Sequence, residues 1–202
     1  MHAGHDDGAG ATRPGQELGR MARLVIDTLA GEGFGVQTRE WDELWNLTIT
    51  GVRRGKACLT VADDGYLRWD YEPEAGADAG PARIAALVLR LLGAPAGPGT
   101  PMRDDAYPRL LLKGAVGRLL EEQGMKVGLL SYEDLESFEV VAEIEVTSPA
   151  RPGRGKVRVT DRGDMEWVCR AGEAFGGDPA AAVAIIAPVL REGVGVRPPR
   201  EA

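Results

Sequence analysis

The chain has few of the side chains that most enzymes use for catalysis. Its 202 residues include two histidines, two cysteines and three serines, and aromatic residues make up 5%. Both histidines, His2 and His5, stand in a Gly- and Asp-rich N-terminal stretch with no apolar pattern. The folded region therefore has no histidine for a Ser-His-Asp triad, a Cys-His pair or a histidine-based zinc site. A site made only of carboxylates stays open, although no spacing in the sequence singles out a pair.

Phosphate-binding glycine motifs are also missing. The sequence contains neither a complete Walker-type loop nor a Gly-x-Gly-x-x-Gly turn after a strand, and it therefore predicts no cofactor. Basic residues are outnumbered, because 24 Lys and Arg stand against 31 Asp and Glu, for a net charge of −7. This balance argues against a nucleic-acid or anionic-membrane partner. The densest basic stretch, Arg151–Lys156, is interpreted as a solvated loop.

Targeting signals and long apolar runs are absent as well. No run approaches the roughly 20 residues of a membrane span, and Met1–Gln16 lacks the apolar centre of a secretory signal. The two cysteines, Cys58 and Cys169, do not align with each other in the internal repeat described next. So few cysteines are typical of a reducing compartment, and we expect a cytoplasmic location.

An internal duplication is the clearest positive signal in the sequence. Residues Leu59–Leu92 align without a gap on Val157–Leu190 at an offset of 98 positions. Upstream of these segments the offset is 91, which predicts a seven-residue insertion between the second and third strands of the second copy. The positions identical in both copies are Val61, Asp63, Gly65, Trp69, Pro81, Ala82, Ala86 and Leu92, which match Val159, Asp161, Gly163, Trp167, Pro179, Ala180, Ala184 and Leu190.

Hydrophobic periodicity assigns elements to each copy. Three-and-four spacing predicts helices at 16–30 and 107–123, and Pro81 and Asp178-Pro179 mark the starts of two more. Strict alternation predicts strands, with a tight turn at Asp64-Gly65. In the two strands beside this turn, one side is apolar and the other is polar: Leu59, Val61, Leu67 and Trp69 share the apolar side, and Arg68 and Asp70 are on the polar side. The expected fold class is α+β: two tandem αββββα repeats, each a four-stranded antiparallel meander flanked by helices, packed as a pseudo-two-fold dimer. The expected domain limits are a disordered tail at 1–15, repeats at 16–93 and 106–194, a Pro/Gly linker at 94–105 and a second disordered tail at 195–202.

The repeated aspartates and tryptophans have two possible interpretations. Asp63 and Asp161 could be paired metal-binding or general-base carboxylates, but Asp beside Gly is more typical of turn formation. Trp69 and Trp167 occupy equivalent positions on the apolar side of a strand, and we interpret them as core residues.

Three other aromatic residues are the candidates for a partner contact. Trp41 lies in an acidic bend and aligns with Tyr132, and Trp45 follows closely on the next strand. Tryptophan and tyrosine are favoured at protein interfaces, so Trp41, Trp45 and Tyr132 are a possible partner contact. The alternative is that they pack under the first helix.

Two stretches carry a resemblance to known proteins. Asp63–Glu72 and Ala77–Leu92 resemble stretches of uncharacterised proteins of high-GC bacteria. The helix–antiparallel sheet–helix order is also similar to that of type III secretion chaperones, which bind protein segments. This resemblance implies that the chain binds a segment of another protein. We therefore predict a non-enzymatic adaptor or chaperone-like module that binds another protein, with its oligomeric state left open. The alternatives are a small-molecule-binding protein or a carboxylate-dependent enzyme with a site between the repeats, and an immunity-type interaction protein.

Overall fold

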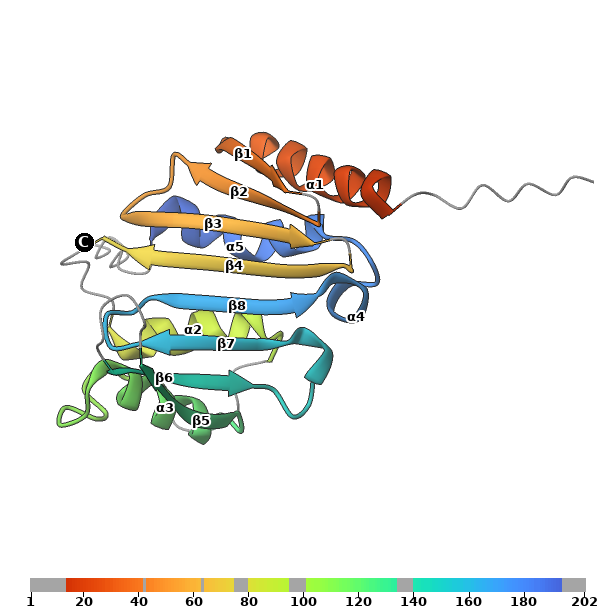
Figure 1. Cartoon of the computed structure of the whole chain (residues 1–202). Coiled ribbons are helices and arrows are strands. Elements are labelled where there is room, and N and C mark those ends of the chain that lie inside the picture. Colours follow the sequence, from red (N-terminus) through yellow and green to blue (C-terminus); the bar gives the residue numbers. More distant parts are fainter. Residues whose placement is uncertain are drawn as a thin grey trace, which may run out of the picture.

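The computed structural model describes residues 14–41, 43–62, 64–74, 80–94, 101–133 and 140–193. Several predictions fall outside the described residues: Asp63, the tail at 195–202 and the 95–100 part of the linker. The tail at 1–15 is also outside them, except for Pro14 and Gly15, which begin the first helix. Within them the protein is α+β, with five α-helices and one antiparallel sheet of eight strands (Figure 1). The strands are β1 Gly35–Trp41, β2 Leu44–Thr50, β3 Gly55–Ala62, β4 Tyr66–Pro73, β5 Lys126–Glu133, β6 Val140–Thr147, β7 Lys156–Thr160 and β8 Met165–Arg170. The helices are α1 Pro14–Gly31, α2 Pro81–Leu91, α3 Leu112–Glu122, α4 Ala171–Phe175 and α5 Ala180–Glu192, with a 3₁₀ turn, η1, at Pro152–Arg154.

The strand order places the middle and the end of the chain side by side. From edge to edge the sheet runs β1-β2-β3-β4-β8-β7-β6-β5, and every neighbouring pair is antiparallel. Strands β4 and β8 adjoin at the centre, whereas β1 and β5 form the two edges. The sheet is thus continuous across the two halves of the chain.

Alternation along the strands separates a buried face from a polar one. Leu59, Val61 and Leu67 are at most 2% exposed, as their spacing predicts. Trp69 lies directly opposite Trp167 in the β4–β8 pair, and both are buried, which confirms their interpretation as core residues. The indole N–H of Trp167 donates to the carbonyl of Arg154 at 3.0 Å.

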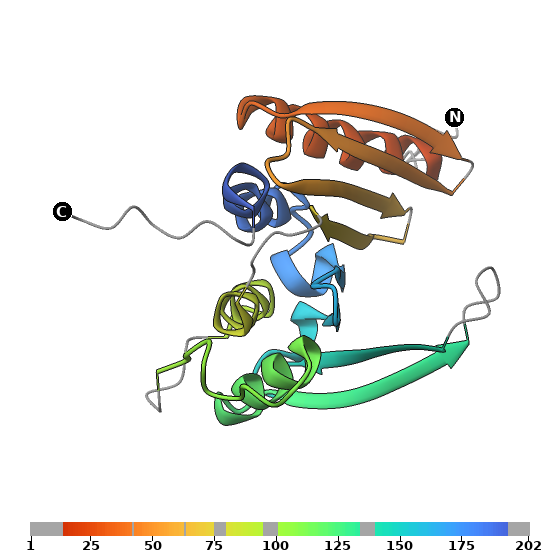
Figure 2. The same cartoon turned by 90° about the vertical axis from the view of Figure 1, so that its left-hand side faces the viewer.

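The long helices cover the buried face and reach across the middle of the sheet. Helix α2 follows β4 but packs against α3, and α5 follows β8 but packs against α1. Figures 1 and 2 show α2 and α5 together on one side of the central strands. The Arg53 backbone N–H donates to the Leu190 carbonyl at 2.9 Å, and Arg191 pairs with Glu32. The last helix therefore completes the core of the first half.

Helix starts differ from the sequence prediction in two places. The helix predicted from Tyr107 begins only at Leu112, because residues 103–110 form turns and the Asp161 carboxylate accepts the backbone N–H of Lys113 at 3.1 Å. Helix α1 begins at Pro14, two residues before its predicted start. The last helix is assigned from Ala180, whose N–H donates to Asp178 Oδ1 at 2.9 Å, so Asp178 caps it as predicted. The short helix α4 was not predicted. Among the described residues, no helix has both the length and the apolar character needed to cross a membrane.

Candidate functional site

The face of the sheet opposite the helices, here called the open face, carries a row of polar side chains. One residue from each of six neighbouring strands is paired directly with the next, from β2 through β3, β4, β8 and β7 to β6. Five strand spacings of about 4.8 Å make this row roughly 24 Å long. The members of this central row are Thr48, Cys58, Asp70, Glu166, Arg158 and Glu145.

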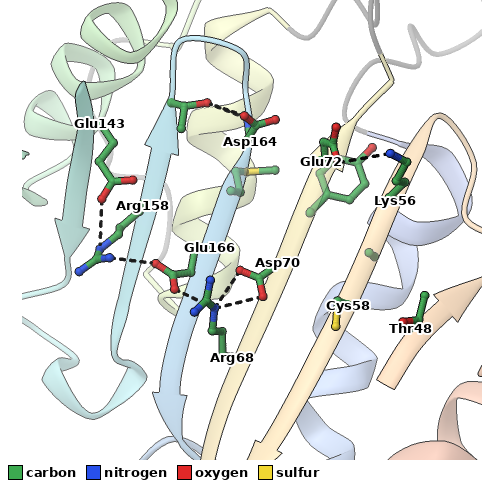
Figure 3. A pocket seen from close by; sticks show the side chains of 14 residues that line it. Thr48, Lys56, Cys58, Arg68, Asp70, Glu72, Glu143, Arg158, Asp164 and Glu166 are labelled. Carbon is green, nitrogen blue, oxygen red and sulfur yellow. Dashed lines mark hydrogen bonds and ion pairs between the residues drawn. The ribbon is translucent and has the colours of Figure 1, made fainter. Parts of the chain in front are cut away.

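Two carboxylates meet at the centre of the row. Asp70 of β4 lies directly opposite Glu166 of β8, an arrangement of like charges that is unfavourable alone. Arg68 compensates for it, because its Nε lies 3.0 Å from Asp70 Oδ1 and 2.9 Å from Glu166 Oε1. Arg158 Nη1 approaches the other Glu166 oxygen at 3.2 Å. The junction of the two halves is therefore joined by ion pairs on its open face (Figure 3).

A second group of acids surrounds Arg158. Its Nε donates to Glu145 Oε2 at 3.1 Å, and the same carboxylate oxygen receives Lys156 Nζ at 2.8 Å. Glu143 is only 6% exposed, and the nearest cation to it is Arg158 Nε, 3.5 Å from Oε1. That Oε1 atom is shielded from solvent and has no hydrogen-bond partner among the described residues. Glu143 is thus the least satisfied member of the network.

Five of the six members of the row, all but Glu145, line a cavity of about 600 Å³. This volume is within the usual range for small-ligand pockets. Five carboxylates and three cationic side chains are among its lining residues. The lining consists of Thr48, Lys56, Ala57, Cys58, Arg68, Asp70, Tyr71, Glu72, Glu143, Arg158, Thr160, Asp164, Met165 and Glu166.

Burial and neighbouring charges move several pKa values around this cavity. Burial raises the pKa of Asp70, with a further contribution from Glu166 and an opposing one from Arg68. Burial also raises the pKa of Glu143 against the attraction of Arg158. For Glu145, burial is outweighed by hydrogen bonds from Lys156 and Arg158, which lower its pKa. The cavity therefore holds carboxyl groups whose ionisation is held back by their surroundings.

Other chemistry finds less support around the cavity. Burial raises the pKa of the Cys58 thiol, which donates to Asn46 Oδ1 at 2.9 Å, so the thiolate is disfavoured. In the described part of the chain, no three His, Cys, Asp or Glu side chains are arranged to hold a metal ion. The carboxylates of the central row are instead held in ion pairs by Arg68 and Arg158.

The three aromatic candidates are not among the residues that line this cavity. Trp41, at the end of edge strand β1, is 50% exposed, and the Arg39 guanidinium lies 4.6 Å from its ring centroid. Trp45 is partly buried against the core. Tyr132 belongs to β5, at the opposite edge of the sheet, and its side chain lies outside the described residues. Trp41 and Trp45 are therefore near neighbours on β1 and β2, where Trp41 pairs with Leu44, and Tyr132 is far from both.

Sequence reasoning missed the residues that line the cavity. Alternation did place Arg68 and Asp70 on the wet face of their hairpin, and this was the available signal. The meeting of these residues with Glu166 depends on the β4–β8 pairing, which joins strands almost 100 residues apart. Asp161, considered as a metal-binding or general-base carboxylate, instead accepts a hydrogen bond at the start of α3.

Comparison of the chain with protein-family models, with curated proteins and with solved structures gave no match.

Proposed function

We propose that the protein is a non-enzymatic, cytoplasmic binding module that holds a segment of another protein on its open face. One observation carries the proposal: in the described part of the chain the four long helices pack on the other face of the sheet, and the open face carries a polar row and a cavity at its centre. Catalysis is less well supported, because the arginines Arg68 and Arg158 hold the central carboxylates in ion pairs.

The length of the central row favours a polypeptide as the ligand. An extended chain advances about 3.4 Å per residue, so the roughly 24 Å of the row matches about seven residues. Polar groups along the row would then contact the side chains that point from the bound segment toward the sheet. A metabolite would cover only part of this length.

The two halves of the chain are proposed to descend from one duplicated αββββα unit. The strand order is the same when counted from either edge, β1 to β4 from one and β5 to β8 from the other. Helix α2 of the first half packs against α3 of the second, and α5 packs against α1, as a fused two-fold dimer would give. In this interpretation the open-face site lies on the pseudo-two-fold axis, at the β4–β8 pair.

A small molecule is the second candidate ligand. The observation in its favour is the cavity itself, whose volume and convergent acids at the junction of the halves suit a compact ligand. In that case the ligand would occupy the cavity near Asp70 and Glu166 without using the ends of the row.

A displayed peptide library tests the proposal. Selection against the purified protein is expected to return peptides that bind wild type and lose affinity for Cys58→Trp, which fills the floor of the cavity. The matched control is Ala86→Trp, on the exposed side of α2 at the other face, and it should bind normally. Failure to select any binder, or binders indifferent to Cys58→Trp, would refute the peptide site. A thermal-shift screen of metabolites, with the same two variants, tests the second candidate.

Trp41 and Trp45 remain a separate proposal for partner contact. Trp41 is the better placed of the two because half of its surface is exposed on an edge strand. If Trp41→Ala and Trp45→Ala both stay folded and keep full affinity for the selected peptides, these tryptophans make no part of the peptide contact.

A further inference from the structure

The charges around the cavity are unevenly satisfied. Arg68 is engaged by Asp70 and Glu166, and Arg158 is engaged by Glu145 and Glu166. The third cation, Lys56, lies 3.7 Å from Glu72, and its side chain is 84% exposed. The two arginines are therefore occupied, and an anionic ligand entering the cavity would meet five carboxylates and one exposed lysine.

Two carboxylates with few partners lie at one end of the cavity, around Thr160. Glu143 of β6 is directly opposite Thr160 of β7 in the sheet. The Thr160 hydroxyl donates to Asp164 Oδ2 at 3.1 Å, and among the described residues no lysine or arginine pairs with Asp164. All three residues line the cavity. Two carboxylates thus flank one hydroxyl at the cavity wall.

Glu143 is the independent sign that this end of the cavity is incomplete. Its side chain is more than nine-tenths buried at the cavity wall, and its Oε1 receives no hydrogen bond within the described residues. The nearest donor, Arg158 Nε, lies 3.5 Å away and gives its hydrogen bond to Glu145. Leaving a buried carboxylate short of a partner is costly, and a cation seated beside it would remove part of that cost.

We infer that the end of the cavity formed by Glu143, Thr160 and Asp164 binds the ammonium or guanidinium group of a basic ligand. The inference rests on the proposed function for its main source of that group, a lysine or arginine side chain on the bound segment. A free polyamine offers the same chemistry. The net charge of −7 would also draw a cationic ligand toward the protein.

Matched peptides test the inference. Acetylated seven-residue peptides with a central Lys, Arg, norleucine or Glu, and free spermidine, are titrated against wild type by calorimetry. The Lys and Arg peptides should bind about tenfold or more tightly than the norleucine peptide, since a charge-assisted contact replaces an apolar one. Asp164→Asn should remove most of this preference, because the amide can still accept from Thr160 but carries no charge. Asp105→Asn, in an exposed ion pair with Arg103 outside the cavity, is the matched control and should keep the preference.

The pH dependence of Lys-peptide affinity is a second measurement, which would not change if Glu143 had only a structural role. The groups facing Glu143 are Arg158, Glu145, Glu166 and Lys156, and burial is the main cause of its raised pKa. Binding of the Lys peptide should therefore tighten as the pH rises from 5 to 7 and drive a proton from the protein. In Glu143→Gln this pH dependence should weaken, while the norleucine peptide should show little pH dependence in either protein.

The outcomes separate this inference from the proposed function. Peptides that bind without any preference for Lys or Arg would keep the protein-binding module and overturn the cationic subsite. Spermidine binding that is sensitive to Asp164→Asn, with no peptide bound, would keep the subsite and overturn the peptide. An equal loss of Lys and norleucine peptides in Asp164→Asn would also overturn the subsite. Absence of binding by every probe would overturn both.

Discussion

Arg158→Gln is the substitution that tests the charged network most directly. The arginine side chain is 32% exposed, but its three partners are less so: Glu143 is 8%, Glu166 18% and Glu145 25% exposed in their side chains. Removing one partner of a fully buried ion pair costs about 3–5 kcal/mol, and an exposed pair is worth about 0.2–1 kcal/mol. This partly buried cluster lies between these limits, so we expect a loss of about 2 kcal/mol.

Urea unfolding followed by far-ultraviolet circular dichroism measures this loss. With a slope of about 2 kcal/mol/M, the midpoint should fall by roughly 1 M. The matched control is Lys56→Gln, which breaks a pair whose side chains are 84% and 64% exposed and should cost less than about 0.5 kcal/mol. A combined Arg158→Gln and Glu143→Gln variant should recover part of the loss, because it removes the most buried uncompensated carboxylate.

The stability loss in Arg158→Gln should depend on pH, with a sign set by the Glu143 pKa. Glu143 has a raised pKa in the folded protein, so the stability it contributes is present below its unfolded value of 4.5 and is lost as the pH rises through the folded value. Without Arg158 the nearby carboxylates are harder to ionise, and the penalty should be full at pH 7 and shrink toward pH 4. A penalty below about 0.5 kcal/mol at pH 7, or one that does not shrink in acid, would refute the reasoning.

Three further predictions concern the core and the open face. Trp167→Phe should cost about 1 kcal/mol more than Trp69→Phe in urea unfolding, because Trp167 loses a hydrogen bond whereas the Trp69 indole N–H has no partner among the described residues; equal losses would contradict this. Iodoacetamide at pH 8 should label Cys58 slowly and Cys169 only after unfolding, since burial raises the pKa of Cys169 to about 12, and rapid labelling of both in the native protein, followed by mass spectrometry, would contradict the described burial. Asp70→Asn should match or exceed wild-type stability by up to about 1 kcal/mol at pH 7, because it removes a carboxyl with a raised pKa, and the gain should fade as the pH falls through that raised pKa toward the ordinary value of 3.8; a clear loss at pH 7 would show that ionised Asp70 is needed by its arginine.

Local patterns in the sequence were enough to predict most elements and their buried sides. Alternation correctly assigned Leu59 and Trp69 to the core, and Asp64-Gly65 forms the expected turn, with Gly65 at a φ of 78°. Pro81 begins α2 as predicted. These features depend on neighbours within a few residues, so periodicity and turn chemistry determine them.

The site could not be predicted in the same way, because it depends on long-range pairing. The central row joins six strands, and the contact of Asp70 with Glu166 requires β4 and β8 to be neighbours in one register. No local pattern in either strand encodes that register. The start of α3 was misplaced for a related reason, since the Asp161 side chain that accepts its Lys113 N–H comes from 48 residues further along the chain.

The composition of the central row is itself an argument for binding. An exposed antiparallel face needs only polar, strand-forming residues such as threonine, and Thr48 meets that need at one end of the row. At the middle of the row, two acids instead face each other directly and depend on Arg68 for compensation. Such a network adds little stability compared with uncharged residues. If Asp70→Asn is as stable as predicted and also binds the basic peptides more weakly, then the opposed acids serve ligand recognition at the expense of stability, as functional sites often do.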